Sequence, residues 1–297
     1  MSLAPPRPAL VAPRALKGVA LVAGATLLFA VADVLGKYLM TRHPVPVVQA
    51  GRYLVNTLLL LAAFYPRHGK LLWRTGRPAM VTGRAVFLAA SSLTMGFALQ
   101  RMPVGETVAV IYLAPFLVMV LAGPLLGETV SPAAWVGAGM AFLGVLLVVR
   151  PGTGLDPVGV VFALTNAALS TGYHLMTRVL IRSESTMAML FHVALTGFAI
   201  FAVLALPALS GFAPSLTDLL LIGALGLLAT VGHFLFTAAY REAPASLLAP
   251  VNYLHLVWAT LLGWGVFAHM PDAISLCGMA LVVVAGGAVA LRASRTG

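Results

Sequence analysis

The residues of this sequence best suited to chemistry are polar side chains embedded in long apolar runs. Thr230, His233, Thr237 and Tyr240 are spaced i, i+3, i+7 and i+10, so they share one face if this stretch is a helix. Their hydroxyl and imidazole groups can donate and accept hydrogen bonds. Such groups either bond neighbouring helices or line a path for a polar solute, and both interpretations stay open at this stage.

Two other apolar runs, residues 158–180 and 245–267, carry comparable groups. The first has Asn166, Tyr173 and His174, and the second has Asn252, Tyr253 and His255. Trp258 and Trp264 are suited to stack on a ring-bearing solute, although Trp264 lies near the end of its run, where an interfacial aromatic belt is the alternative. The candidate residues of a substrate pathway are therefore Tyr112, Asn166, Tyr173, His174, His233, Thr237, Tyr240, Asn252, Tyr253, His255 and Trp258.

Three charged residues also fall within or at the ends of apolar runs. Asp33 and Lys37 are four residues apart, so on a helix they can pair and lower each other's desolvation cost, or Asp33 can handle a substrate or a proton. We read Asp33 as the only carboxylate well inside a span. Arg52 either meets a substrate carboxylate or caps a neighbouring helix.

Signatures of covalent chemistry are absent from the sequence. There is no HExxH, GxSxG or Walker A motif, and the histidines lack metal-ligand spacing on one helix. The single cysteine, Cys277, excludes an intramolecular disulfide and a cysteine-rich metal site. We expect no catalytic residue, no metal, no cofactor and no evident ATPase subunit. An intramembrane enzyme is the rival hypothesis that these absences argue against.

Composition indicates which elements must position these residues. Of 297 residues, 61% are hydrophobic and only 9% are charged, with a mean hydropathy of +1.01. Soluble domains carry about a quarter charged residues, so the lipid bilayer is the expected surroundings. Apolar runs of around 20 residues without two-residue alternation predict membrane-spanning helices rather than a barrel. The formal charge of +10 does not indicate nucleic-acid binding, because basic residues lie between the apolar runs.

The expected fold is an all-α integral membrane protein with ten transmembrane helices. Residues 1–17 and 292–297 are expected to be cytoplasmic tails. We also expect the first apolar run to remain in the protein rather than be removed as a signal peptide, because it has a counterpart later in the chain. The predicted spans are 18–39, 45–65, 85–101, 104–124, 131–149, 158–180, 187–207, 217–239, 245–267 and 272–291.

An internal repeat relates the two halves of the chain. Adding 141 to a position in the first half gives its counterpart in the second: Pro66 maps to Pro207, Tyr112 to Tyr253 and Asp33 to His174. The repeats are residues 18–150 and 158–291. Because each repeat has five spans, the second enters the bilayer from the opposite side, which makes the repeats inverted. The fifth and tenth spans, rich in Gly and Ala, are expected to support the other eight from the periphery.

Basic residues predict the orientation. With the N-terminus inside, twelve basic residues fall on the inner side and three on the outer side. This bias predicts that both termini are cytoplasmic.

Several segments together resemble the EamA-type repeat of the drug/metabolite transporter superfamily. The second copy departs from the pattern, since His269 stands where the Gly-Glu carboxylate is expected and Leu256 replaces the proline matching Pro115. Within the superfamily, the sequence is most similar to the bacterial aromatic amino acid exporter branch. The segments are Phe97-Ala98-Leu99-Gln100-Arg101-Met102-Pro103, Leu113-Ala114-Pro115, Leu126-Gly127-Glu128, Gly137 to Gly144, and Arg150-Pro151-Gly152.

The resemblance implies a secondary transporter in the bacterial cytoplasmic (inner) membrane. It would export small metabolites, foremost aromatic or hydrophobic amino acids, by alternating access. A drug or other metabolite permease of the same fold, or a small-molecule receptor without flux, are the alternatives. The expected partners are the small-molecule substrate and the lipid bilayer, and we expect a monomer.

Overall fold

The computed structural model describes residues 12–127, 132–150, 154–181, 183–243 and 245–296, and every regular element among them is helical. Ten crossings are formed by twelve α-helices, because the fourth and ninth crossings are each split in two. A short 3₁₀-helix (η1) follows the second crossing. The elements are α1 (Ala12–Met40), α2 (Val45–His68), η1 (Gly69–Leu72), α3 (Pro78–Arg101), α4 (Val104–Ile111), α5 (Ala114–Leu126), α6 (Pro132–Val149), α7 (Pro157–Leu180), α8 (Thr186–Leu209), α9 (Leu216–Glu242), α10 (Ala245–Asn252), α11 (Leu254–Phe267) and α12 (Ala273–Thr296).

The helices are long and apolar enough to lie in lipid. Six of them meet the length and hydropathy of a membrane span, and three shorter apolar helices accompany them in the described part of the chain. Large apolar side chains cover the outside of the bundle, among them Val203, Leu206 and Leu220, each more than 60% exposed. A surface of this kind is unfavourable in water and suits hydrocarbon.

Several predicted boundaries were wrong, and prolines explain most of them. The third crossing begins at Pro78 instead of residue 85, because proline in the first turn of a helix removes no hydrogen bond. Pro66 and Pro207 lie inside α2 and α8, near their ends, instead of ending them. Residues 12–17 and 292–296 are helical instead of tails, and residues 1–11 and Gly297 lie outside the described residues.

The two broken crossings occupy equivalent places in the two repeats. One break separates α4 from α5 at Tyr112, and the other separates α10 from α11 at Tyr253, which is 141 positions later. Pro115 contributes to the first break, because it has no N–H to donate to residue 111. Tight i to i+3 bonds replace α-helical ones at both breaks: Phe116 donates to the Leu113 carbonyl (3.1 Å) and Leu256 to the Tyr253 carbonyl (3.1 Å).

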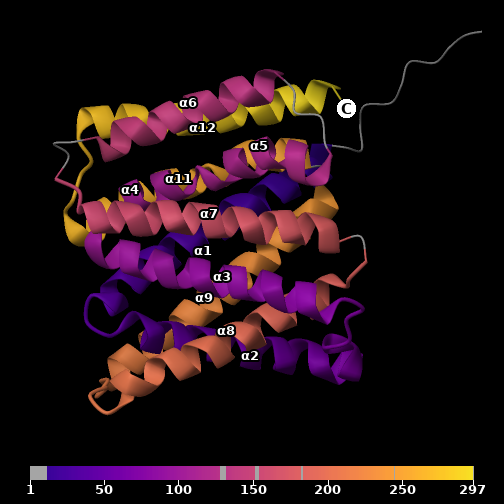
Figure 1. Cartoon of the computed structure of the whole chain (residues 1–297), viewed down its shortest axis with the longest axis vertical. Coiled ribbons are helices and arrows are strands. Elements are labelled where there is room, and N and C mark those ends of the chain that lie inside the picture. The colour runs from indigo at the N-terminus through magenta and orange to yellow at the C-terminus, as the bar shows by residue number, and fades with distance from the viewer. Residues whose placement is uncertain (1–11, 128–131, 151–153, 182, 244, 297) are drawn as a thin grey trace, which may run out of the picture.

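The helices pack as two inverted repeats related by a two-fold pseudo-symmetry, as the sequence predicted. α1 packs along α9 and the equivalent helix α7 packs along α3, so each of these contacts joins one repeat to the other. Figure 1 shows α6 and α12 side by side along one edge, with α2 and α8 at the opposite edge. The predicted peripheral position of the fifth and tenth spans is therefore confirmed. The two helices approach closely where Gly144 meets Gly278.

Gly286 provides a test of the packing behind the second break. A Cβ atom at Gly286 would lie 1.8 Å from the Tyr253 ring, whereas the neighbouring Gly287 has open space. We expect Gly286→Ala to displace Tyr253 and destabilise the protein by roughly 1–3 kcal/mol through overpacking. Gly287→Ala adds the same methyl group to the same helix without a clash. Thermal unfolding in detergent should show a lower Tm for Gly286→Ala only; equal Tm values would contradict this packing.

Candidate functional site

The two helix breaks meet at the centre of the bundle. The Tyr112 hydroxyl donates a hydrogen bond to the Asn252 carbonyl oxygen (2.8 Å), and the rings of Tyr112 and Tyr253 lie 5.1 Å apart. A break leaves backbone groups without their helical partners. The tyrosine at one break therefore satisfies a carbonyl group at the other, and both breaks become part of one polar cluster.

Asp33 and His255 form the charged part of this cluster. His255 Nε2 and Asp33 Oδ2 are 3.0 Å apart, joining α1 of the first repeat to α11 of the second. Both side chains retain some accessibility, 19% for Asp33 and 17% for His255. The His255 ring lies 6.0 Å from the Tyr112 ring. A carboxylate that reaches a partly accessible space inside a helical bundle is a candidate to bind a cation or a proton.

Aromatic rings lie close to Asp33 and His255. The Phe29 ring lies 4.9 Å from the His233 ring, 6.3 Å from the Phe236 ring and 6.2 Å from the His255 ring. The His233 side chain is exposed although α9 packs against α1 and α2. We name Phe29, Asp33, Tyr112, His233, Asn252, Tyr253 and His255 the central site.

Lys37 does not pair with Asp33, which corrects the first of the two predicted roles for these residues. Its Nζ atom donates to the Leu99 carbonyl (2.6 Å) and to the Met102 carbonyl (2.7 Å) at the end of α3. The last carbonyl groups of a helix lack partners and carry partial negative charge, so they attract the ammonium group. Asp33 therefore pairs with His255 and not with Lys37.

The predicted residues of α7 divide into two kinds. Asn166 is buried and donates to the Ser91 carbonyl (2.7 Å) and hydroxyl (2.9 Å), so it joins α7 to α3 instead of facing a pathway. That candidate role is corrected, because a buried amide must use its hydrogen bonds locally. His174 is exposed, and its ring lies 5.1 Å from the Tyr173 ring.

Arg84 is a residue that the sequence reasoning missed. It is only 3% exposed, and it donates to the Tyr173 hydroxyl (2.6 Å), the Thr177 hydroxyl (2.6 Å) and the Met189 carbonyl (3.2 Å). Placing the third span at residue 85 left Arg84 outside it. The proline at residue 78 was the signal that the helix begins two turns earlier.

The remaining candidates lie on α2, α9 and α11. The Thr237 hydroxyl donates to the His233 carbonyl on its own helix (2.8 Å). The side chain of Tyr240 lies outside the described part of the structure. Two buried nitrogen atoms, Nε of Arg52 and Nε1 of Trp258, have no hydrogen-bond partner among the described residues. Arg52 lies over the Tyr53 ring at 4.8 Å, so neither of its two predicted roles is settled by a polar contact.

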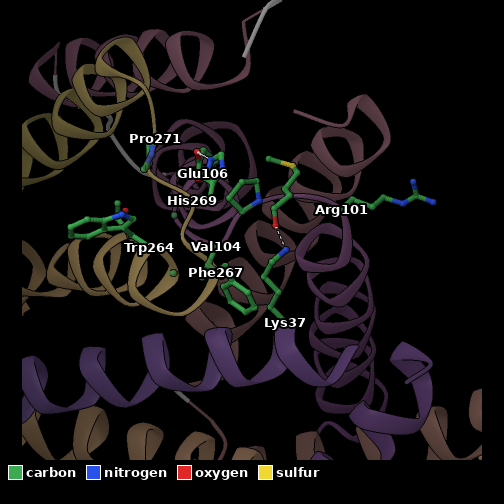
Figure 2. Close-up of a pocket in the computed structure, with 13 residues that line it drawn as sticks. Lys37, Arg101, Val104, Glu106, Trp264, Phe267, His269 and Pro271 are labelled. Atoms are coloured by element: carbon green, nitrogen blue, oxygen red, sulfur yellow. Dashed lines mark hydrogen bonds and ion pairs between the residues drawn. The ribbon is translucent and has the colours of Figure 1, made fainter. Parts of the chain in front are cut away.

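A second polar site, the end pocket, lies between α1, α4 and α11 at one end of the bundle (Figure 2). Its volume is about 230 Å³. Glu106 lies in its wall, and His269 Nε2 donates to Glu106 Oε1 (2.9 Å). Glu106 is 3% exposed, so a second buried carboxylate lies at the start of the fourth crossing, in addition to Asp33 farther inside the first. The lining residues are Lys37, Arg101, Met102, Pro103, Val104, Gly105, Glu106, Thr260, Gly263, Trp264, Phe267, His269 and Pro271.

Each end of the bundle is fastened by an ion pair between the repeats. At one end Arg101 of α3 binds Asp156, the residue before α7 (2.9 Å), and at the other Lys17 of α1 binds Glu242 of α9 (2.7 Å). Arg101 and Glu242 are 141 positions apart, and their partners Asp156 and Lys17 lie two positions from exact correspondence, so the two pairs match approximately in the repeat with their charges exchanged. We name these pairs the end clasps.

A second set of contacts follows the same symmetry. His43, between α1 and α2, lies 3.3 Å from Asp218 at the start of α9. Its counterpart Glu184, between α7 and α8, accepts hydrogen bonds from the Thr75 hydroxyl (2.8 Å) and the Gly76 N–H (3.1 Å), just before α3. The loops at the two ends of the bundle therefore occupy equivalent places in the repeats. One carries a basic residue, His43, and the other an acidic residue, Glu184.

Two inverted repeats, equivalent broken helices and a polar site at their crossing define this chain as a membrane transporter. The sequence profile of the EamA-like transporter family matches residues 16–150 and 157–290, one match for each repeat. The chain belongs to this family and is a multi-pass membrane protein.

Named relatives carry chemically different solutes. The chain is 29% identical over 260 residues to an S-adenosylmethionine uptake transporter of Rickettsia felis, covering 85% of each chain. It is 28% identical to a riboflavin transporter of Brucella anthropi, covering 86% of this chain and 92% of the relative. It is 26% identical to the pseudopaline exporter CntI of Pseudomonas aeruginosa, covering 90% and 94%. A solved crystal structure with 23% identity shares the fold, with a TM-score of 0.66 over 96% of this chain and 98% of that chain.

Replacement of the Tyr112 hydroxyl tests the link between the two breaks. Tyr112→Phe leaves the Asn252 carbonyl without its partner, which we expect to cost about 1–3 kcal/mol of stability and to reduce transport. Tyr253→Phe is the matched control, because the Tyr253 hydroxyl makes no hydrogen bond to the described residues. Thermal unfolding and flux of both variants should separate them. An unchanged Tyr112→Phe protein would contradict the link.

The end clasps predict a pH dependence. The Arg101 guanidinium, helped by backbone N–H groups of α7, holds the pKa of Asp156 below its ordinary value, and the Lys17 ammonium lowers the pKa of Glu242. A depressed carboxyl pKa means that the clasp stabilises the fold above the ordinary pKa and is lost as the pH falls through the lowered one.

We therefore expect Asp156→Asn and Glu242→Gln each to lower the Tm slightly at pH 7, since both pairs are exposed. The difference from the parent protein should shrink as the pH falls below about 4, the ordinary carboxyl pKa, and vanish below the lowered pKa values of Asp156 and Glu242, where the parent carboxyl groups are also neutral. Thermal unfolding across this pH range is the measurement. A difference that persists in acid would show that the amide variants act by another route.

Proposed function

We propose that this protein exports small zwitterionic metabolites across the bacterial cytoplasmic membrane by alternating access through the central site, with aromatic and hydrophobic amino acids as the first candidates. The observation that carries the proposal is the Asp33–His255 pair (3.0 Å) beside the two broken helices. Both termini are proposed to face the cytoplasm, in line with the distribution of basic residues.

The chemistry of the central site supports a solute with a positive group and an apolar body. Asp33 offers a carboxylate to an ammonium or similar cation, and Phe29 offers a ring face close by. The Tyr112 and Tyr253 rings add an amphipathic wall. Arg52, with its unpartnered buried Nε atom, is proposed to meet the carboxylate of the solute as it passes.

The relatives support a small-molecule solute and widen the list of candidate substrates. The substrates for which they are named, S-adenosylmethionine, riboflavin and pseudopaline, each carry a ring or a charged group, as the proposed solute does. The relatives include uptake and export, so the outward direction rests on the resemblance to the exporter branch. A permease for one of these larger solutes is the second candidate function.

Alternating access follows from the symmetry of the end clasps. Because the Arg101–Asp156 and Lys17–Glu242 pairs match approximately in the repeat, we expect that releasing one end while the other stays closed produces two conformations of similar energy. The central site lies between the two clasps and would face each side in turn. A receptor without flux would need no such equivalence.

Proteoliposomes containing the purified protein test the proposal. We expect saturable counterflow of labelled L-phenylalanine, and a panel containing other amino acids, S-adenosylmethionine and riboflavin should rank the candidate substrates. Asp33→Asn should reduce flux of the preferred solute at least tenfold, because it removes the carboxylate from a partly buried site. Cys277→Ser, an exposed change on α12, is the control expected to keep full flux.

The same vesicles also test the direction of transport and its coupling to protons. Export requires efflux from the side that carries the termini, and a pH gradient should change the rate if the protein exchanges a proton during the cycle. Absence of counterflow for every solute of the panel, with saturable binding retained, would favour the receptor and overturn the proposed function.

A further inference from the structure

We infer that the end pocket is a second solute-binding site, which holds the ammonium and carboxylate groups of an amino-acid-type zwitterion between Glu106 and Lys37. The solute class is that of the proposed function and rests on it, whereas binding in this pocket does not depend on transport. The pocket is one helical turn from Asp33 along α1, about 6 Å. Asp33 and His255 are not among its lining residues.

Glu106 supplies the negative pole. Its side chain is 4% exposed, and it uses one oxygen, Oε1, for the bond from His269. The other oxygen, Oε2, is buried and has no hydrogen-bond partner among the described residues. A buried carboxylate oxygen without a partner is costly, so its place in the wall of a pocket indicates a donor that arrives with a ligand.

Lys37 supplies the positive pole on the opposite wall. An ammonium group has three N–H donors, and the carbonyl groups of Leu99 and Met102 use two of them. The third can meet a carboxylate oxygen in the pocket. Figure 2 shows Lys37 and Glu106 on different sides of the pocket, with Lys37 directed at the end of α3 and Glu106 beside His269.

The charge balance selects the class of ligand. Arg101 is neutralised by Asp156 (2.9 Å), and His269, the other basic group of the wall, already bonds Glu106 Oε1 (2.9 Å). The Glu106 Oε2 atom and the Lys37 ammonium remain as opposed poles. A lone anion would be repelled by Glu106, and a lone cation by Lys37. A solute that carries both charges on neighbouring atoms satisfies both poles, and this is the arrangement of an α-amino acid.

The remaining walls suit an apolar or aromatic side chain. Trp264 is 49% exposed, and the Phe267 ring lies 5.5 Å from the Lys37 ammonium. The volume of about 230 Å³ is of the order of one amino acid and smaller than typical drug-sized sites. Leu247 replaces Glu106 at the equivalent position of the second repeat, so the carboxylate that holds the ammonium group exists only at this end.

Trp264 provides a local readout of binding. In a protein with Trp73, Trp135 and Trp258 replaced by Phe, indole emission reports only from the end pocket. We expect L-phenylalanine to change this emission saturably. Phenethylamine, which lacks the carboxylate, and 3-phenylpropionate, which lacks the ammonium group, should each bind at least tenfold more weakly, because each loses a charge-assisted hydrogen bond.

Two variants of this single-tryptophan protein complete the test. Glu106→Gln should weaken L-phenylalanine binding at least tenfold and leave 3-phenylpropionate binding no weaker, since only the ammonium contact is lost. Asp33→Asn is the matched control, and it should leave the Trp264 titration unchanged while it removes flux. Equal binding of all three solutes, no response to L-phenylalanine, or an unchanged Glu106→Gln titration would each overturn the inference.

The analogue series requires no substitution at Glu106, so the inference can fail even if Glu106→Gln does not fold. Failure of the proposed function has a different signature. In that case the Trp264 titration would select the zwitterion while proteoliposomes show no flux of any solute.

Discussion

The requirement that every backbone polar group in lipid be satisfied within the protein controls the rest of this structure. Two crossings are interrupted at Tyr112 and Tyr253, where helical hydrogen bonding is locally lost. The protein tolerates these interruptions because they face each other and the Tyr112 hydroxyl reaches the Asn252 carbonyl. Irregular backbone at membrane depth is thereby confined to the interior, where it also lines the central site.

Duplication explains the architecture, whereas divergence between the copies explains the chemistry. The end clasps keep their positions in both repeats but exchange their charges. Asp33 is matched by His174, and Glu106 by Leu247, so the carboxylates of the central site and of the end pocket belong to the first repeat alone. The scaffold is therefore close to symmetric, whereas the charged groups inside it are not.

Much of the fold could be predicted from the sequence, because span length, charge and the 141-residue offset are properties of the chain itself. Tyr112, Asn252, Tyr253, His255 and Asp33 were candidates before the structure, and the structure brings them together. Their partners were less predictable. The spacing along α1 would also allow Lys37 to pair with Asp33. Lys37 instead bonds the carbonyl groups at the end of α3, and this depends on where α3 ends relative to α1.

Arg84 and Glu106 were missed for different reasons. Arg84 lies within two turns of the helix start at Pro78 and was placed outside the third predicted span, whereas Glu106 fell inside the fourth predicted span, at its third residue, and was not singled out. Their burial depends on neighbouring helices, which spacing along one chain does not reveal. The helix-start signal at Pro78 would have moved Arg84 inside the third span.

The most direct test of the account is a pair of distance measurements at the two ends of one protein. With Cys277 replaced by Ser, spin labels at residues 42 and 220 report on one end, and labels at their repeat equivalents 183 and 79 report on the other; all four positions are exposed. The account predicts that the preferred solute or its gradient lengthens one distance while the other stays short, and that the reverse state is also populated. Two distances that rise and fall together, or never change, would contradict it.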